Sequence, residues 1–136
     1  MSTTRSSDAG VQVSGVTTIG IPVTDQDRAV KFYVGVLGLE KRLDVPMPGG
    51  GRWIVVAPQA STGTTLALVS AHDGVPAGVE TGIRLTTPDA DAAHAALVSR
   101  GVEAGEVLRW PGVPAMFSFR DQDGNGLELV EAAAVT

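Results

Sequence analysis

The sequence has 136 residues, of which 43% are hydrophobic, and this is enough for one domain with a proper core or for two small modules that share one. Its formal net charge of −5 at pH 7 disfavours nucleic acid as a partner, because the phosphates would be repelled. The chain has no cysteine, which excludes disulfides, thiolate metal sites and a cysteine nucleophile.

The N-terminal end predicts a tail rather than a targeting segment. Residues 1–14 are rich in Ser and Thr and have no periodicity, so we expect a flexible tail on which function does not depend. The first ten residues lack the apolar core of a signal peptide, and no apolar run approaches the roughly 18 residues of a membrane helix. We therefore predict a cytoplasmic protein that does not associate with membranes.

The first half of the chain predicts a strand, a helix and three more strands. Residues 16–23 read as a strand, and residues 25–38 as a helix that begins at Thr24 or Asp25 and ends at Gly38. Extended segments follow near 39–45, 52–58 and 64–70, separated by Gly- and Pro-rich breakers. Residues 71–80 carry Gly and Pro without a period and read as a linker.

The second half repeats this order. A strand at 81–87 precedes a helix at 88–101, with Pro88 near its first turn and Gly101 past its end, and then extended segments near 102–110, 115–121 and 126–132. IPVTDQDRA matches LTTPDADAA with an offset of 64, and GTTLALV matches GNGLELV with an offset of 61. We predict one domain at 15–132, made of module 1 (15–70), the linker and module 2 (81–132).

Period-two alternation assigns the strand residues to two faces of the sheet. In each module the helix covers one face, and the other face is left free to curve around a ligand. The first strand of each module shows the pattern best. The predicted helix-facing residues are Ile19, Ile21, Val23, Ile83 and Leu85, and the opposite face carries Thr18, Gly20, Pro22, Gly82, Arg84 and Thr86.

The duplication, the stretch DQDRAVKFYVGVLGLE and the ending DQDGNGLELVE resemble the vicinal oxygen chelate superfamily, which includes glyoxalases, extradiol dioxygenases and bleomycin-resistance proteins. The resemblance spans residues 16–131. It implies an α+β fold in which two tandem β-α-β-β-β modules form a curved mixed sheet around a cup, the glyoxalase/bleomycin resistance fold. It also implies a homodimer. The superfamily includes enzymes and pure binding proteins, so the fold alone does not assign a function.

In metal-using members the resemblance implies an ion held by His or Glu at the first and last strands of each module. The corresponding positions here are Thr18, Ala67, Gly82 and Glu128, and only Glu128 is a ligand type. First-row metals ordinarily need three or four protein donors. We therefore predict no metal site and no cofactor, with a weakly bound divalent metal, completed by water, as the alternative.

The ending DQDGNGLELVE also matches the first half of a calcium-binding loop, through Asp121, Asp123 and Asn125. That loop requires a bidentate Glu at its twelfth position, which is Ala132 here. The residues after the match alternate like a strand instead of opening a helix. We predict an Asp/Asn/Gly turn that enters a strand.

The face predicted to line the cup is apolar and partly aromatic, which is typical of a small-molecule site. Two tryptophans and a methionine suit a flat, ring-bearing ligand, although either tryptophan is equally compatible with the core or a dimer interface. The predicted ligand-binding residues are Thr18, Trp53, Thr65, Ala67, Arg84, Trp110, Met116 and Glu128.

Two charged residues on this face have open roles. Arg84 is either a solvated strand charge, a partner of Glu128 or a clamp for a ligand oxygen. Glu128 is either a solvent-facing carboxylate or, if enclosed, a candidate general base; burial would raise its pKa and Arg84 would lower it. His72 lies in the linker, and His94 is expected to be an exposed helix residue directed away from the cup.

The leading functional hypothesis is a metal-independent protein that binds a small organic molecule in its cup, like the bleomycin-resistance branch. The alternative is a metal-dependent glyoxalase-type lyase, isomerase or dioxygenase with an incomplete metal site, or an enzyme in which Glu128 acts alone as the catalytic residue. A third possibility is an interaction module whose cup is filled by its own side chains. Whether the protein is an enzyme stays open at this stage.

Overall fold

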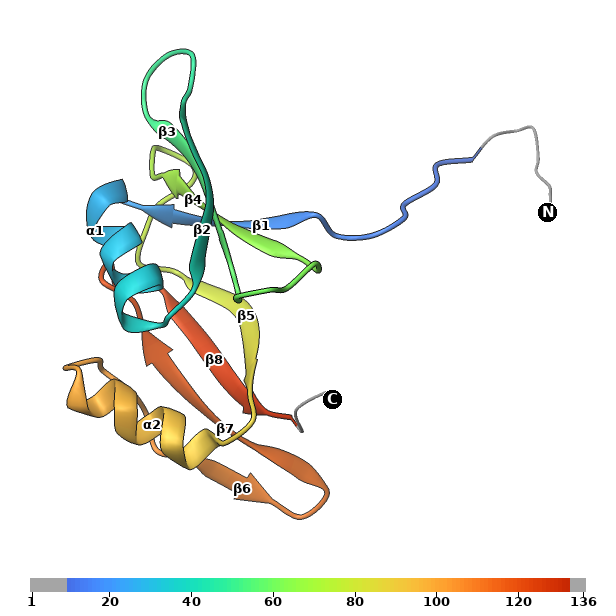
Figure 1. The fold of residues 1–136 in the computed structure, drawn as a ribbon, viewed down its shortest axis with the longest axis vertical. Helices are drawn as coiled ribbons and strands as arrows, with labels where there is room; N and C mark the ends of the chain where they lie inside the picture. The colour runs from blue at the N-terminus through green and yellow to red at the C-terminus, as the bar shows by residue number, and fades with distance from the viewer. Residues whose placement is uncertain (1–9, 133–136) are drawn as a thin grey trace.

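A computed structural model describes residues 10–132 as two similar units joined by a short connection (Figure 1). The N-terminal residues predicted to form the tail lie partly outside this range. The elements of module 1 are β1 (Thr18–Val23), α1 (Gln26–Val30), a π-helical continuation η1 (Lys31–Val36), β2 (Glu40–Pro46), β3 (Arg52–Ala57) and β4 (Thr65–Ser70). Those of module 2 are β5 (Glu80–Thr87), α2 (Ala90–Ser99), β6 (Leu108–Trp110), β7 (Val113–Arg120) and β8 (Gly126–Glu131).

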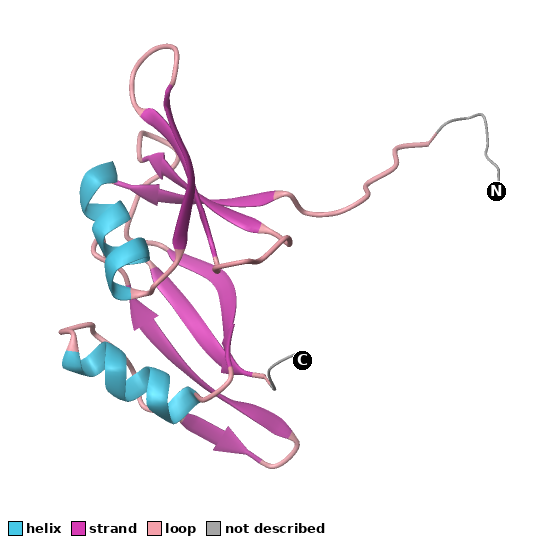
Figure 2. Ribbon diagram, viewed as in Figure 1, coloured by secondary structure: helices cyan, strands magenta, loops and turns pink. Residues whose placement is uncertain are grey.

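The two modules have the same sheet topology, so the predicted duplication and α+β class are confirmed. The strand order is β1-β4-β3-β2 in one four-stranded sheet and β5-β8-β7-β6 in the other. In each sheet the first and last strands of the module pair in parallel, and the remaining pairs are antiparallel. The mixed sheet is thus present as two separate halves, and both helices lie on the same side of the molecule (Figure 2).

The helix boundaries follow from capping residues that the repeat places at matching positions. Asp25 caps α1 and Asp89 caps α2, each accepting a hydrogen bond from the backbone N–H three residues further on. Gly38 and Gly101 end the two helical segments with φ of 78° and 81°, a conformation that glycine adopts without strain. The predicted helix ends are therefore confirmed.

The predicted strand near 102–110 is largely irregular. Only Leu108–Trp110 forms a strand, and the segment before it contacts β7 through a single bridge between Ala104 and Phe119. Gly105 allows this close approach, because a Cβ there would lie 3.0 Å from the hydroxyl of Ser118. The sequence pattern at this segment, which lacks clean alternation, did not reveal that its ladder is interrupted.

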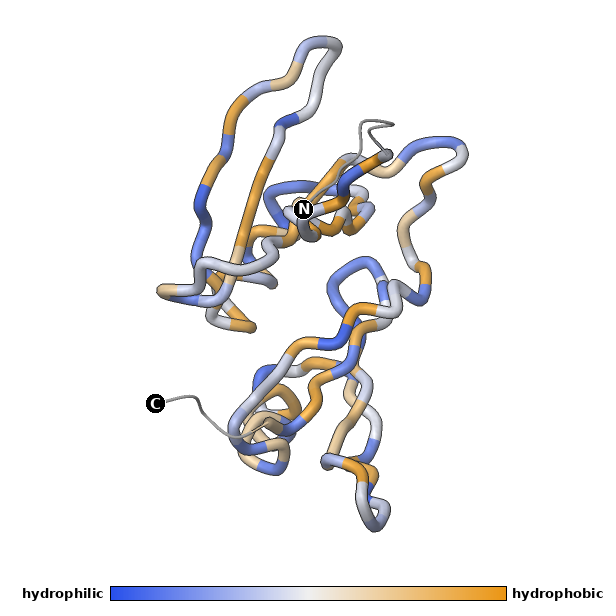
Figure 3. The backbone as a smooth tube through the Cα atoms, turned by 90° about the vertical axis from the view of Figure 1, so that its right-hand side faces the viewer, coloured by the Kyte–Doolittle hydropathy of each residue, from blue (hydrophilic) through white to orange (hydrophobic). Residues whose placement is uncertain are grey.

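The helix-facing sides of both sheets share one interior, as the small size of each module requires. Phe32 from η1 stacks on Phe119 from β7 at 6.5 Å between ring centroids, so aromatic rings of the two modules meet. Ile21, Ile54 and Leu127 are buried in the same cluster. Figure 3 shows hydrophobic stretches along the strands of both modules.

The turn at residues 121–125, named the intermodule turn below, joins module 2 to module 1. Tyr33 donates its phenolic hydrogen to Asp121 Oδ2 at 2.7 Å, and the side-chain amide of Asn125 donates to the carbonyl oxygen of Pro22 at 2.8 Å. Burial, together with Asp121, raises the pKa of Tyr33 well above its ordinary value, so the phenol stays a donor. The predicted turn entering a strand is confirmed.

The carboxylates of the intermodule turn are satisfied by donors of the chain itself. Both oxygens of Asp121 accept hydrogen bonds from within the turn, and Asp123 accepts from the backbone and hydroxyl of Thr24. Burial opposes ionisation of Asp123, but the hydrogen bonds from Thr24 outweigh it and lower the pKa. These oxygens are thus engaged in holding the modules together, which explains the aspartates without calcium.

Candidate functional site

The open face of module 1 is the side of its sheet turned away from α1. Neighbouring residues on β3 and β4, such as Ile54 and Leu68, belong to the core, and strand alternation places their neighbours on the other side. The open face is consequently formed mainly by apolar side chains. It carries Leu43, Val45, Trp53, Val55, Thr65, Ala67 and Val69.

This face leaves large apolar side chains accessible. Leu43 and Val45 are 43% and 40% exposed, and Val45 pairs directly with Trp53 across the β2–β3 ladder. A β-bulge between Lys41 and Leu43 shifts the register of β2, which obscured its alternation in the sequence. A contiguous exposed apolar surface of this kind is characteristic of a ligand or partner site.

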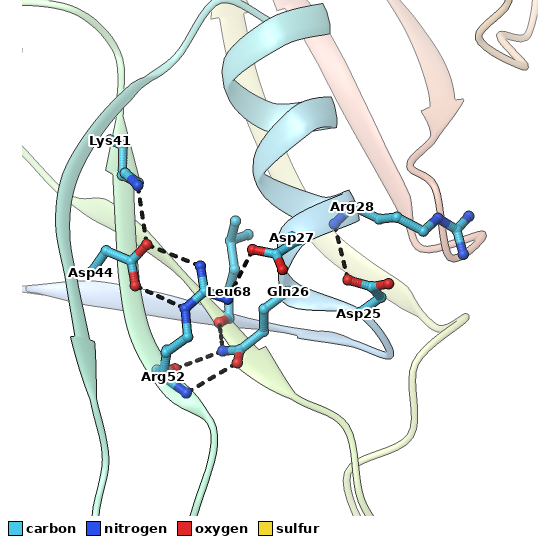
Figure 4. Close-up of polar contacts among 8 residues, drawn as sticks. All are labelled: Asp25, Gln26, Asp27, Arg28, Lys41, Asp44, Arg52 and Leu68. Carbon is cyan, nitrogen blue, oxygen red and sulfur yellow. Dashed lines mark hydrogen bonds and ion pairs between the residues drawn. The ribbon is translucent and has the colours of Figure 1, made fainter.

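A polar cluster on the opposite side fixes the strand that carries Trp53 (Figure 4). Arg52 Nε and Nη2 donate to the two carboxylate oxygens of Asp44, both at 3.0 Å, and Nη1 donates to Asp27 at 2.9 Å. This guanidinium, aided by Lys41, lowers the pKa of Asp44 to about 2. We name Arg52, Asp44 and Asp27 the Arg52 clamp.

Gln26 extends this cluster from the helix to the sheet. Its side-chain amide donates to the carbonyl oxygens of Arg52 at 2.6 Å and Leu68 at 2.8 Å, and its oxygen accepts from the backbone N–H of Arg52 at 3.0 Å. The first turn of α1 is therefore tied to β3 and β4. These contacts hold the backbone immediately before Trp53 in place.

The open face of module 2 is more polar. Arg84 Nε donates to Glu128 Oε1 at 2.8 Å, and Arg120 pairs with Glu80 nearby. A cavity of about 130 Å³ lies between the two ion pairs, with Gly82 and Ser118 also in its wall. Of the roles left open for Arg84 and Glu128, the pairing is thus observed, although the side chains are 67% and 38% exposed.

The same rung of the two parallel ladders carries opposite chemistry in the two modules. Gly20 lies opposite Ala67 in module 1, and the repeat-related Arg84 lies opposite Glu128 in module 2. Both observed pairs agree with the sequence offsets of 64 and 61, so the alignment of the repeats is correct at this rung. The register in module 2 shifts before Arg84, where Gly82 has φ of 74°.

The four positions at which the resemblance implies metal ligands do not form a donor set. Thr18 Oγ1 donates to the backbone of Thr65, Ala67 and Gly82 have no donor atoms in their side chains, and Glu128 is held by Arg84. The described residues contain no group of three or more His, Cys, Asp or Glu placed to hold a metal ion. A divalent metal does not fit these residues.

The predicted ligand-binding residues fall into two groups within one chain. Thr18, Trp53, Thr65 and Ala67 belong to the sheet of module 1, and Arg84, Met116 and Glu128 share the open face of module 2. Trp110 lies at the end of β6 and is 53% exposed. The cavity beside Glu128 has no wall residue from module 1.

A second and larger cavity of about 520 Å³ lies between the modules, and sequence reasoning missed it. We name it the intermodule cavity. Ile19 was predicted to be buried under the helix, yet it is 37% exposed because it lines this cavity. The apolar residues of the wall have the pattern of core positions, so no sequence signal distinguishes them. They include Ile19, Leu37, Leu39, Pro58, Ile83 and Leu85.

Neither histidine belongs to an open face. His94 was expected to be exposed, but its ring packs edge-on against Phe117 at 5.1 Å between centroids and is half-buried. Its predicted direction, away from the open face, is correct because Phe117 is a core residue. His72 is exposed in the linker and its Nδ1 lies 2.8 Å from the carbonyl oxygen of Asp73.

Comparisons with known proteins agree on one family. The model of the family described as Glyoxalase/Bleomycin resistance protein/Dioxygenase superfamily matches residues 15–129. The structure is similar to TnmS3, an antibiotic binding protein from Streptomyces sp. CB03234, with 34% identity and a TM-score of 0.80, covering 91% of this chain and 100% of that one. A superfamily member from Sphaerobacter thermophilus DSM 20745 has 35% identity and a TM-score of 0.81, covering 88% and 98%.

A shorter similarity connects the chain to a curated protein. The uncharacterized protein YurT of Bacillus subtilis (strain 168) is 51% identical over 47 residues. The match covers 34% of this chain and 36% of YurT, so the chain spans about a third of that relative's length.

Among the described helices, none is long and apolar enough to cross a membrane.

Proposed function

This chain belongs to the Glyoxalase/Bleomycin resistance protein/Dioxygenase superfamily, and we propose that it binds a small organic molecule on its open faces without a metal. The observation that carries the proposal concerns Glu128, at a position where metal-using members would place a metal-ligating side chain. Glu128 accepts a hydrogen bond from Arg84 at 2.8 Å, and the equivalent position in module 1 is Ala67. Charge that a metal would supply is replaced by the guanidinium.

The two open faces indicate the chemistry of the ligand. The face of module 1 offers Trp53 among aliphatic side chains, which suits a planar apolar ring system. The face of module 2 offers a partly exposed Arg84–Glu128 pair, which suits a carbonyl, hydroxyl or charged substituent. The similarity to an antibiotic binding protein supports a ligand of this kind.

We further propose that the protein works as a cytoplasmic homodimer. One chain does not bring its two open faces into one cavity, but a second copy can place module 2 of one chain opposite module 1 of the other. Exposed Leu43, Leu108 and Trp110 would then be covered. Nothing in the net charge of −5 favours nucleic acid as an additional partner.

The two tryptophans allow a direct test, because the chain has one on each module. Titrating Trp110→Phe protein, whose fluorescence comes from Trp53, with a panel of planar aromatic antibiotics is expected to quench emission saturably and raise Tm. Trp53→Ala is expected to weaken binding by about tenfold or more, and Trp110→Ala serves as the matched comparison. If no compound in the panel alters fluorescence or Tm, the proposal is wrong.

The enzyme alternative makes a different prediction. A metal-dependent lyase, isomerase or dioxygenase would acquire stoichiometric metal during purification without chelator, and added divalent ions would increase turnover. If Glu128 acted alone as a general base, Glu128→Gln would abolish turnover and leave folding intact. Binding that survives exhaustive chelation, with no turnover, supports the metal-free proposal over both versions.

A further inference from the structure

The parallel ladder of module 2 is interrupted by a bulge in β5. Glu80 lies opposite Gly126 and Arg84 lies opposite Glu128, so three residues of β5 span the same length as one residue of β8. In module 1, β1 and β4 pair continuously over all six residues of β1. The bulge is therefore a feature of module 2 that the duplication alone does not explain.

Two glycines leave the space beside this bulge open. Gly82 and Gly126 both line the cavity of about 130 Å³ described above, which we name the bulge pocket. A Cβ on Gly82 would meet nothing within 4 Å, and a Cβ on Gly126 would collide with the carboxylate of Glu80. The repeat-related residues of module 1 are Thr18 and Thr65. Module 1 thus carries side chains at both positions where the bulge pocket has none.

Charged side chains of both signs stand in the wall of the bulge pocket. The wall includes Glu80, Arg84 and Glu128 together with Ser118, and Arg120 pairs with Glu80 beside it. The two ion pairs have no net formal charge. A ligand group with a single charge would leave one charge unbalanced there, whereas a group that carries both signs would preserve the balance.

These side chains keep unused donors and acceptors beside one another. Within the described residues, Arg84 donates only through Nε and Glu128 accepts only at Oε1, so both Nη nitrogens and Oε2 are left for a ligand. Glu80 accepts from Arg120 at Oε2, and its Oε1 lies where a Cβ of Gly126 would be. The bulge pocket therefore offers a guanidinium and two carboxylate oxygens to the same small volume.

We propose that the bulge pocket binds a compact zwitterion, the ammonium and carboxylate of an α-amino acid. The ammonium group donates to Glu80 Oε1 and Glu128 Oε2, and the carboxylate accepts from the two Nη nitrogens of Arg84. A volume of about 130 Å³ suits a group of a few non-hydrogen atoms. The inference rests on the proposed function, because it names the substituent that the open face of module 2 recognises on an organic ligand.

Ligands that share a ring and differ in charge test the zwitterion directly. L-phenylalanine carries both charges at pH 7, phenethylamine only the positive one and 3-phenylpropanoate only the negative one. Nuclear magnetic resonance titrations that follow the backbone amides of Gly82 and Ser118 are expected to show saturable shifts with L-phenylalanine. Each singly charged ligand should bind at least about tenfold more weakly. Equal affinities, or tighter binding of either singly charged ligand, would overturn the proposal.

Single charge deletions test which side chain recognises which end. Arg84→Gln is expected to remove the preference for L-phenylalanine over phenethylamine, and Glu128→Gln should reduce the preference over 3-phenylpropanoate. Arg109→Gln is the matched control, because it breaks the exposed pair between Arg109 and Asp91. The control should keep both preferences. Preferences that survive in Arg84→Gln, or that disappear equally in Arg109→Gln, would contradict the proposal.

A steric variant tests the place and leaves all four charges intact. Ser118 lies opposite Glu128 in the β7–β8 ladder, so a larger side chain there should enter the bulge pocket. Ser118→Leu is expected to weaken binding of L-phenylalanine at least about tenfold, and Ser118→Ala should weaken it much less. Thermal unfolding checks that both variants are folded. If Ser118→Leu is folded and binds like the wild type, the zwitterion does not occupy this pocket.

Free glycine separates this inference from the proposed function, because it has the zwitterion without a ring. It is expected to shift the same amides as L-phenylalanine. If glycine and L-phenylalanine bind there but no compound of the aromatic panel quenches Trp53, the proposed function is wrong and the pocket inference stands. If the panel quenches Trp53 and neither amino acid shifts these amides, only the pocket inference is wrong.

Discussion

The two modules share a backbone plan and differ in what their open faces present. At the same rung, module 1 places Gly20 beside Ala67, and module 2 places Arg84 beside Glu128. The helix-facing sides remain alike, with leucines at repeat-related positions in β4 and β8 buried in the common core. Burial therefore keeps one face of a duplicated module similar, and the other face is free to acquire separate chemistry.

The largest expected effect concerns the turn before the last strand of each module. Asn125 is fully buried and bonds to Pro22, Gly78 and Val79, whereas its repeat counterpart Thr64 is exposed. Asn125→Ala is expected to reduce the free energy of unfolding by about 3 kcal/mol, because buried backbone groups lose their partners. Thr64→Ala should change it by less than about 0.5 kcal/mol. Urea denaturation measures both. Similar losses in the free energy of unfolding would show that the hydrogen bonds of Asn125 do not stabilise the contact between the modules.

Two glycines of β1 and β5 are expected to respond differently to substitution by alanine. Gly82 has φ of 74°, so Gly82→Ala should destabilise the protein by about 1 kcal/mol through backbone strain. Gly20 has no positive φ, and a Cβ there would make an ordinary 3.8 Å contact with Val69. Gly20→Ala should therefore be neutral or stabilising by about 0.5 kcal/mol. Thermal unfolding of both variants checks the difference, and a gain from Gly82→Ala would contradict the assigned backbone conformation.

Replacing the Arg84–Glu128 pair of module 2 by the Gly and Ala found at the matching positions of module 1 tests how the two open faces differ. Because Arg84 is largely exposed and Glu128 is partly exposed, Arg84→Gly with Glu128→Ala should change stability by less than about 1 kcal/mol. Binding of ligands with charged substituents should weaken and lose its salt dependence, while apolar ligands should bind about as before. Calorimetry at two ionic strengths distinguishes these outcomes. If the preference between charged and apolar ligands is unchanged, the Arg84–Glu128 pair does not take part in ligand binding.

The smallest expected effect concerns acid and the Arg52 clamp, which is specific to module 1. The folded-state pKa of Asp44 is lowered to about 2, so its stabilisation is present above the unfolded pKa of about 3.9 and is lost as pH falls toward 2. The Asp44→Asn variant should lose less free energy of unfolding than the wild type as the pH falls from about 4 to 2. Asp91→Asn, which breaks the exposed pair with Arg109, is the control. Identical acid profiles for both variants would argue against the clamp.

Much of the fold could be predicted because its signals are local. Asp25 and Asp89 begin helices and Gly38 and Gly101 end them, since capping and positive φ depend on residues a few positions apart. Family membership was likewise recognisable from the repeat and is confirmed. The segment near 102–110 was predicted less well, because its path is decided by contacts with β7 that no local pattern encodes.

For the candidate site, the sequence indicated the face on which individual residues lie but not how the two sheets are arranged around it. Alternation placed Arg84, Glu128 and Ala67 on the faces opposite the helices, where Arg84 pairs with Glu128 and Ala67 is fully buried, and the offsets identified which positions correspond. It did not indicate that the two sheets of one chain stay separate, or that Ile19 would line a cavity between the modules. Periodicity describes which face of a strand is buried and carries no information about which sheet covers that face.

The sequence by itself determined the duplication, the caps, the two-faced strands and the lack of metal-ligand side chains at three of the four expected positions, because each depends on residue type and spacing. The tertiary structure decided how the modules meet, through Tyr33, Asp121 and Asn125, whose hydrogen bonds join residues about a hundred positions apart. It also decided that Arg84 pairs with Glu128 and that the edge of β5 away from β8 has no strand partner in the described chain. Long-range pairing of polar groups and edges depends on where the packed cores place them, and that placement is not written in any local stretch of residues.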